Sequence, residues 1–310
     1  MTAEAEALLQ RADAGDRRAL SRCITWIEVR HAGIGEALGA VRRTAGPGAP
    51  HVLGVTGPPG AGKSTFVDGL IRAARARGER VAVVAVDPSS PFSGGAILGD
   101  RIRLEDHTAD DGVFVRSLSS RGHLGGLSGA TAEVVDLFDR VGFDTVIIET
   151  VGVGQSELGV MEVADTVVVV LTPESGDAVQ AMKAGLLEIA DVFVVNKADR
   201  PGAARLAREL ERSVALAELP WAPPVLVAVA TERRGVDEVV AAAAEHLAWS
   251  ANAGLPMWKR RRADAAVRLA LDLVAEAARS AAHDKLVADG LEQEVRDGVL
   301  SPREAALRLT

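Results

Sequence analysis

The stretch that most constrains how this chain can fold is residues 52–65, where an apolar run changes abruptly into glycines, a lysine and hydroxyl residues. Within it, Gly57, Gly62, Lys63 and Ser64 fit the pattern G-x-x-x-x-G-K-[ST]. In this pattern the glycines let successive backbone N–H groups face the phosphates of a nucleotide, and the following helix adds its positive N-terminal end. The stretch therefore predicts a strand, a phosphate-binding loop and a helix start.

Each part of the loop has an expected role. Lys63 would reach the β- and γ-phosphates, and the Ser64 hydroxyl would ligate Mg²⁺. The other residues expected around the phosphates are Pro58, Pro59, Gly60, Ala61 and Thr65. A glycine-rich turn without a ligand is the alternative, but the apolar segment 51–56 and the amphipathic segment 64–76 supply the strand and helix that a phosphate loop requires.

The segments that follow alternate between strand-like and helix-like patterns, which is typical of a parallel sheet covered on both faces. Strands are predicted at 51–56, 80–86, 112–117, 143–149, 165–171, 191–196 and 224–230. We therefore expect an α/β fold of the P-loop NTPase class, a mostly parallel sheet flanked by helices with N- and C-terminal helical extensions. The expected divisions are a segment that is helical throughout residues 1–45 and ends at 46, a nucleotide-binding domain at 47–252 and a helical segment at 253–310.

A second motif, Asn196-Lys197-Ala198-Asp199, closes the predicted strand at 191–196 and matches N-K-x-D. The Asp199 carboxylate can accept hydrogen bonds from the ring N–H and the amine of guanine, which adenine cannot offer together. Asn196 would brace the loop, and the stem of Lys197 would lie over the base. Ala230-Thr231 is expected to place a backbone N–H against the base oxygen at the end of the last strand.

Acidic residues at other strand ends predict a metal site. Glu149 closes the strand at 143–149 and is expected to hold an Mg²⁺-bound water or to act on water, while the Gly152 N–H would donate to the γ-phosphate. A helix-capping or turn acid is the alternative for Glu149. Val153 stands where Ras-like proteins carry a water-positioning glutamine, so we expect slow intrinsic hydrolysis, aided by Gln155, a neighbouring loop or a partner.

Three further residues have weaker patterns. Asp87 ends the second strand and would hold a metal water or position the attacking water, with a turn aspartate as the alternative. Asp177 and Lys183 follow the strand at 165–171, where they would report the nucleotide state or contact a partner. An N-cap and an exposed helix lysine explain these two equally well.

Composition limits the class of protein. The formal net charge of −8 disfavours a sequence-independent nucleic-acid binder. The single cysteine, Cys23, excludes an intrachain disulfide and is expected to be a small buried hydrophobe. No apolar run reaches the ~18 residues of a membrane span, so a cytoplasmic protein is expected.

Apolar residues after position 252 recur every three to five positions and form a narrow stripe. Such a stripe packs either against its own domain or against a second copy of the chain, and the spacing does not separate the two. The stripe residues are Val267, Leu271, Val274, Ala278, Ala281 and Leu286.

Taken together, these motifs resemble those of the MeaB/ArgK family of SIMIBI-class GTPases, which includes the methylmalonic aciduria type A protein. The motifs are G-P-P-G-A-G-K-S-T at 57–65, D-P-S-S-P at 87–91, G-D-R at 99–101, E-T-V-G-V-G-Q-S-E at 149–157 and N-K-A-D at 196–199. The similarity extends from about residue 15 to residue 300. One departure is Ala230-Thr231, where many relatives have Ser-Ala.

The resemblance implies several properties. It implies binding of GTP or GDP, guanine recognition by the N-K-A-D residues, a third switch around 172–188 and a homodimer formed through terminal helices. It also implies a chaperone that gates cofactor loading of an adenosylcobalamin-dependent acyl-CoA mutase, such as methylmalonyl-CoA mutase. The implied ligands of GTP and Mg²⁺ are Lys63, Ser64, Asp87, Asp100 and Glu149. A nickel metallochaperone GTPase and a P-loop small-molecule kinase are the alternative functions.

Overall fold

The structure is a computed structural model of the 310-residue chain. It describes residues 2–31, 33–39, 49–87, 106–107, 109–119, 126–150, 163–174, 187–252, 267, 270–271, 274–275, 278–279 and 281–309. The chain divides into two compact units, Met1–Ala265 and Ala266–Thr310, which are described separately.

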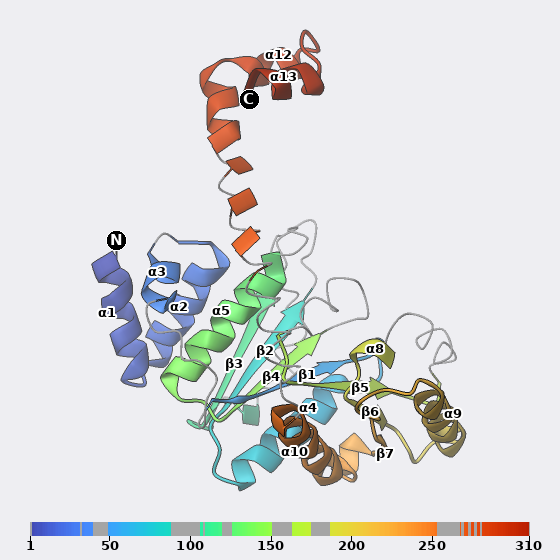
Figure 1. Cartoon of the computed structure of the whole chain (residues 1–310). Coiled ribbons are helices and arrows are strands. Elements are labelled where there is room, and N and C mark those ends of the chain that lie inside the picture. The colour runs from blue at the N-terminus through green and yellow to red at the C-terminus, as the bar shows by residue number, and fades with distance from the viewer. Residues whose placement is uncertain are drawn as a thin grey trace. The chain divides into compact units, whose positions relative to one another are not determined.

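A seven-stranded parallel sheet forms the centre of the first unit (Figure 1). The strand order is β3-β2-β4-β1-β5-β6-β7, so the strand before the phosphate loop lies between β4 and β5. Most strand residues are buried β-branched residues, as expected for strands covered on both faces. The expected α/β fold is therefore confirmed. The strands are β1 (His51–Thr56), β2 (Val81–Asp87), β3 (Val113–Ser119), β4 (Thr145–Thr150), β5 (Thr166–Leu171), β6 (Val192–Val195) and β7 (Val225–Val227).

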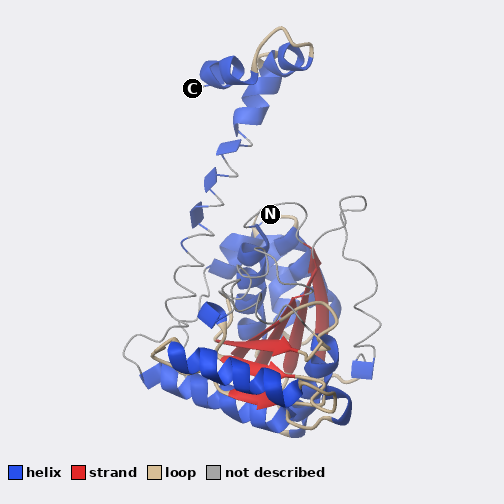
Figure 2. Cartoon of the chain, turned by 90° about the vertical axis from the view of Figure 1, so that its right-hand side faces the viewer, coloured by secondary structure: helices blue, strands red, loops and turns tan. Residues whose placement is uncertain are grey.

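Helices cover both faces of the sheet (Figure 2). On one face, α4 (Lys63–Ala76) and α10 (Val236–Asn252) bury their apolar sides in one hydrophobic cluster. On the other face, a larger cluster joins the sheet to the short helix α8 (Leu187–Ile189) and to five longer helices. These are α1 (Thr2–Asp13), α2 (Arg17–Glu28), α3 (Ile34–Gly39), α5 (Gly126–Val141) and α9 (Ala203–Leu216).

The N-terminal region differs from the prediction that residues 1–45 are helical throughout. Three separate helices are described there, because the backbone turns at Gly15, with φ of 90°, and again at Arg30, with φ of 52°. Asp16 caps α2 by accepting hydrogen bonds from the N–H groups of Arg18 and Ala19. Residues 40–48 lie outside the described residues.

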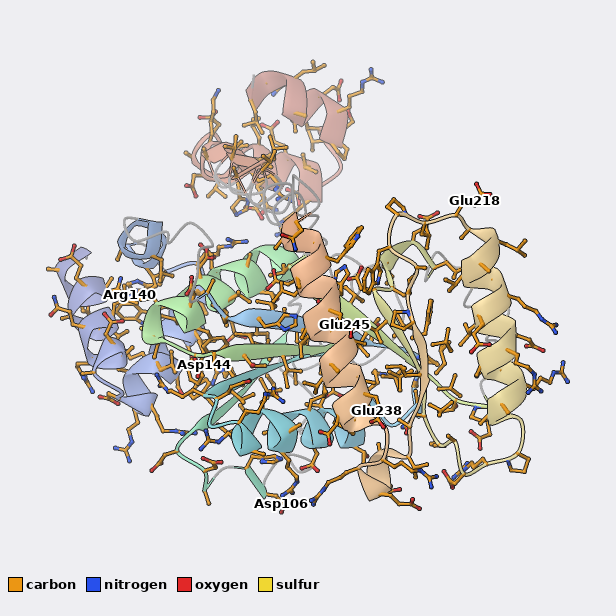
Figure 3. All side chains as sticks on the ribbon, turned by 60° about the horizontal axis from the view of Figure 1, so that its bottom comes forward. Asp106, Arg140, Asp144, Glu218, Glu238 and Glu245 are labelled. Carbon is orange, nitrogen blue, oxygen red and sulfur yellow. The ribbon has the colours of Figure 1, made fainter. Side chains whose placement is uncertain are left out.

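These helices form part of the main core. Ile24 and Ile27 of α2 are buried in the same cluster as the sheet, and Arg140 of α5 reaches Asp13 of α1 at 2.7 Å (Figure 3). The N-terminal helices therefore complete one face of the sheet.

The last predicted strand, 224–230, is too long by several residues. Strand β7 ends at Val227, and the short 3-10 helix η4 (Ala230–Glu232) begins where the strand was expected to end. The chain then turns back through Arg233, with φ of 59°, so that Val229 pairs with Arg234 in an antiparallel bridge. Ala230 is therefore part of a tight turn and not of the sheet.

The second unit contains α12 (Leu291–Arg296) and α13 (Pro302–Leu309), joined by a turn. Its small core consists of Leu291, Leu300 and Ala305. Among the residues that the structure describes, no helix is both long and apolar enough to cross a membrane.

Candidate nucleotide site

Several of the predicted site residues that the structure describes lie where strands of the parallel sheet end. The phosphate loop follows β1, Glu149 lies near the end of β4, and Asn196 directly follows β6. Ligands of open α/β sheets bind beyond this carboxyl edge. The structure therefore brings the phosphate and base motifs, which are far apart in the sequence, to one edge.

Two glycines of the loop have conformations and surroundings that favour glycine. Gly57 has φ of 146°, and a Cβ atom there would overlap the carbonyl oxygen of Val170. Gly62 has φ of 85°, and its Cβ would lie 2.6 Å from Nδ2 of Asn196. A side chain at either position would push the loop away from its neighbours.

Lys63 is the buried cation of the loop, with 6% of its surface exposed. Its Nζ donates to the carbonyl oxygen of Gly57 at 2.7 Å and to that of Pro58 at 3.2 Å. The ammonium group is thus held against the loop between β1 and α4, and its predicted contact with the β- and γ-phosphates stays a prediction.

Ser64 and Glu149 form the part of the site that suits a metal ion. The Ser64 hydroxyl donates to Oε1 of Glu149 at 2.6 Å, and Glu149 is largely buried. A hydroxyl beside a buried carboxylate is a pair of hard oxygen donors, the type that Mg²⁺ prefers. The pair fits the predicted Mg²⁺ site and links α4 to β4.

Asn196 joins three parts of the site. Its Nδ2 donates to the carbonyl oxygen of Ala61 at 2.8 Å, and its Oδ1 accepts from the N–H of Ala230 at 3.1 Å. Because Asn196 is buried, these bonds fix the end of β6 to the phosphate loop and to η4. The N–H of Ala230, expected to face the base, is therefore bonded to Asn196.

Lys197 and Asp199 complete the base motif. Lys197 takes a left-handed conformation, with φ of 55°, and its Nζ donates to the carbonyl oxygen of Gly60 at 2.9 Å. Asp199 is exposed in the turn that follows. The motif thus contacts the phosphate loop through two side chains while its carboxylate remains accessible.

A pair of buried hydroxyls was missed by sequence reasoning. Thr150 Oγ1 donates to Thr56 Oγ1 at 3.0 Å, which connects the residue before the phosphate loop to the residue after Glu149. Both threonines are buried at the ends of their strands, Thr56 in β1 and Thr150 in β4. The signal that sequence reasoning could have used is a hydroxyl residue at the end of each of these two strands.

Other predicted residues are placed only in part. Pro59, Thr65 and Thr231 are exposed, and the backbone of Asp87 ends β2. The remaining predicted residues lie outside the described residues, namely Asp100, Gly152, Gln155, Asp177 and Lys183.

Comparison with known proteins agrees with this geometry. The family model described as methylmalonyl-CoA mutase-associated GTPase MeaB matches residues 20–285. The chain belongs to the MeaB family of GTPases. A protein of Pyrococcus abyssi described as a GTPase is 46% identical over 260 residues, which cover 82% of this chain and 80% of that protein.

The MeaB family assignment is supported by two further relatives. The GTPase ArgK of Escherichia coli is 41% identical over 242 residues, covering 74% of this chain and 72% of ArgK. A crystal structure of a LAO/AO transport system kinase superposes with a TM-score of 0.69 at 27% identity, covering 100% of this chain and 97% of that one. The resemblance found in the motifs is thus confirmed, and membership of a GTPase family implies that the chain binds GTP.

Proposed function

We propose that this MeaB-family protein is a GTP-hydrolysing chaperone that gates cofactor loading of an adenosylcobalamin-dependent acyl-CoA mutase and protects that enzyme. The family description, which names methylmalonyl-CoA mutase as the associated enzyme, supports the choice of partner. The structure supports the nucleotide-dependent part of the proposal.

The observation that carries the proposal is the pair of Asn196 hydrogen bonds to Ala61 and Ala230. Through them the base motif is attached to the loop that would hold the phosphates. A nucleotide that binds the base motif with its base and the loop with its phosphates would therefore contact two motifs that are hydrogen-bonded to each other. Asp199, accessible in the same motif, supplies the carboxylate that selects guanine.

The chemistry proposed at the phosphate end needs few groups. Lys63 would stabilise the negative charge of the phosphates, and the backbone N–H groups of the loop would orient them. Ser64 and Glu149 would hold Mg²⁺, which when bound neutralises phosphate charge. Because Val153 occupies the position of the usual glutamine, the intrinsic rate is expected to be low until Gln155 or a partner orients water.

Replacement of Asp199 tests the choice of base. In Asp199→Asn the carboxylate that accepts two hydrogen bonds is lost, so we expect GTP affinity to fall about a hundredfold and xanthosine triphosphate to be preferred. Glu211→Gln, a matched change on the exposed face of α9, should leave both affinities unchanged. The measurement is fluorescent-nucleotide competition; retained preference for GTP in Asp199→Asn would contradict the guanine assignment.

Native affinity purification tests the proposed partner. The full chain, loaded with a non-hydrolysable GTP analogue and Mg²⁺, should recover a cobalamin-dependent mutase subunit from its own cell extract. A Lys63→Ala variant, which should lack the nucleotide, is the control for nucleotide dependence. Recovery of a nickel enzyme would overturn the proposed partner and favour the metallochaperone alternative.

We also propose that the chain forms a homodimer through its C-terminal segment. Val267, Leu271 and Val274 of the predicted stripe are 60%, 64% and 68% exposed. Apolar side chains spaced along one helical face and left accessible are typical of surfaces that pack against another chain. A second copy supplies the same stripe and so matches it in chemistry.

A further inference from the structure

A pocket of about 660 Å³ lies between α2 and the edge strand β3. One wall consists of α2 residues, including Arg17, Arg18 and Arg22, and the other includes His107 and the start of β3. The volume is within the range of small-molecule sites. The nucleotide site does not use this pocket.

The pocket is rich in positive charge. Its described lining includes three arginines and a histidine but no carboxylate, although the chain as a whole carries a net charge of −8. Arg18 makes no ion pair or side-chain hydrogen bond with any residue in the described part of the chain. The ion pair between Arg22 and Glu4 is long, at 3.8 Å between two exposed side chains.

Asp68 is an acid beside the pocket that has partners of its own. Asp68 Oδ1 lies 2.6 Å from Nε2 of His107, and Asp68 also pairs with Arg72. Burial raises the pKa of Asp68, but the hydrogen bonds from Arg72 and His107 outweigh burial, so the carboxyl pKa lies below its usual value. Asp68 is therefore matched by its own partners and does not neutralise Arg17 or Arg18.

The base of the pocket is apolar and fixed. Arg22 lies over the ring of Trp26, with Cζ 5.3 Å from the ring centroid, and Arg17 lies over Phe114 at 5.6 Å. Both rings are buried, so each presents a fixed apolar face to the guanidinium group that lies over it. A ligand would meet guanidinium groups beside an apolar surface.

Arg17 also decides which kind of ligand fits. Its guanidinium donates to the carbonyl oxygen of Asp111, at 3.3 Å, in the turn before β3, and to that of Val113, at 2.6 Å, in the edge strand β3. An added peptide strand would need the Val113 carbonyl for pairing, so Arg17 disfavours strand addition here. A compact anion, held by the guanidinium groups, meets no such obstacle.

The pocket is separate from the nucleotide site. Val113 begins β3 and pairs with Val81 at the start of β2, whereas the phosphate loop follows the opposite, carboxyl end of β1. Asp106 directly precedes the pocket residue His107 in the chain. Figure 3 shows Asp106 well away from α9, the helix that follows the base motif. A ligand could therefore occupy the pocket while the nucleotide site is filled.

We propose that this pocket binds a small phosphate monoester with an apolar body. Arg18 and Arg22 would contact the phosphate dianion, while Arg17 would supply a fixed charge beside it. Trp26, Phe114 and the start of β3 would contact the apolar part. A monoanionic carboxylate of the same size would be attracted less strongly by the three arginine charges than a phosphate dianion.

Phenyl phosphate is a suitable probe for this proposal. The full chain is first saturated with a non-hydrolysable GTP analogue and Mg²⁺, so that the phosphate loop cannot take up the probe. Binding is then measured by titration calorimetry and by saturation transfer to the ring protons in NMR. We expect saturable binding that weakens with added salt, and weaker binding of benzoate.

The double variant Arg18→Ala/Arg22→Ala should bind phenyl phosphate at least about tenfold more weakly, since each lost charged hydrogen bond costs about this factor. Arg212→Ala, an exposed arginine on α9, is the matched control and should bind like the wild type. Unchanged melting temperature and GTP-analogue affinity in the double variant would show that fold and nucleotide site are intact.

Two results would overturn the proposal. One is no saturable binding of phenyl phosphate to the wild-type protein. The other is equal affinity of the wild type and the double variant, which would place the probe elsewhere. Neither result bears on the proposed GTPase function, because that function is measured at the phosphate loop and with other variants.

Discussion

At the residue scale, the connections between motifs depend on a few buried polar side chains. Asn196 is the clearest case, because it reaches both the phosphate loop and η4. Glu149 and Ser64 make a second connection, between β4 and α4. A change at one of these residues should therefore affect elements that are distant in the sequence.

Asn196→Ala should lower the free energy of unfolding by about 2–4 kcal/mol, because it removes two hydrogen bonds and leaves buried backbone groups of Ala61 and Ala230 without partners. Asn252→Ala is the matched control: Asn252 is exposed and bonds only to the carbonyl oxygen of Ala248 among described residues, so its loss should cost less than about 0.5 kcal/mol. Urea denaturation of nucleotide-free protein is the measurement. Equal losses in the two variants would contradict the connecting role of Asn196.

Cys23 should be unreactive in the folded protein. Burial raises the pKa of its thiol from 9.0 to about 11, so the thiol stays protonated at pH 8. We expect slow labelling by a disulfide reagent in buffer and fast labelling in denaturant. Because the unfolded thiol ionises first as pH rises, the free energy of unfolding should decrease above pH 9. A Cys23→Ala variant should lack this part of the alkaline decrease; rapid native labelling would show that the thiol is accessible.

At the scale of elements, the sequence predicted the interiors of the strands better than their ends. The valine-rich strands and the loop after β1 were found where expected, because a parallel strand buried on both faces leaves a continuous apolar run. Ala230 was misplaced, since an apolar residue suits a tight turn as well as a strand when Asn196 satisfies its N–H. Hydrogen bonds from side chains to residues far away in the chain leave no local pattern in the sequence.

The N-terminal helices illustrate the same limit. Their apolar spacing predicted helices, but the breaks depend on Asp16 capping α2 and on Arg30 in a left-handed conformation, and the latter is uncommon for arginine. Nothing in the spacing showed that α2 covers the sheet. Burial of Ile24 in the main cluster came only from the structure.

Ile24→Ala tests whether α2 is part of the main core. Ile24 is fully buried, so its truncation should lower the free energy of unfolding by about 3 kcal/mol. Leu216→Ala, at a leucine that is 85% exposed at the end of α9, should change stability by less than about 0.5 kcal/mol. Thermal and urea unfolding give both values. A separate early transition for Ile24→Ala would instead indicate that the N-terminal helices unfold independently.

At the scale of the whole molecule, the chain presents two kinds of accessible surface. The carboxyl edge of the sheet carries the polar groups of the candidate nucleotide site, whereas the C-terminal segment carries exposed apolar side chains. These surfaces belong to different compact units. Association and nucleotide binding should therefore be separable by mutation.

Leu271→Glu should convert the proposed homodimer into a monomer, because it places a charge in the apolar stripe. Val299→Glu introduces the same charge at an exposed apolar residue outside the stripe and should leave the dimer intact. Light scattering coupled to size-exclusion chromatography measures the mass of each variant, and GTP-analogue affinity should stay constant. A dimer that persists in Leu271→Glu would place the interface elsewhere.

The position of β1 in the sheet has a consequence for synthesis on the ribosome. Strand β1 pairs with β4 and β5, which end at Thr150 and Leu171, so the strand that carries the phosphate loop emerges about a hundred residues before its neighbours. Such distant pairing slows folding and leaves β1 unpaired in the nascent chain. A chain arrested before Leu171 should therefore be unable to retain GTP, and the nascent protein would acquire its nucleotide only after more than half of its length has been translated.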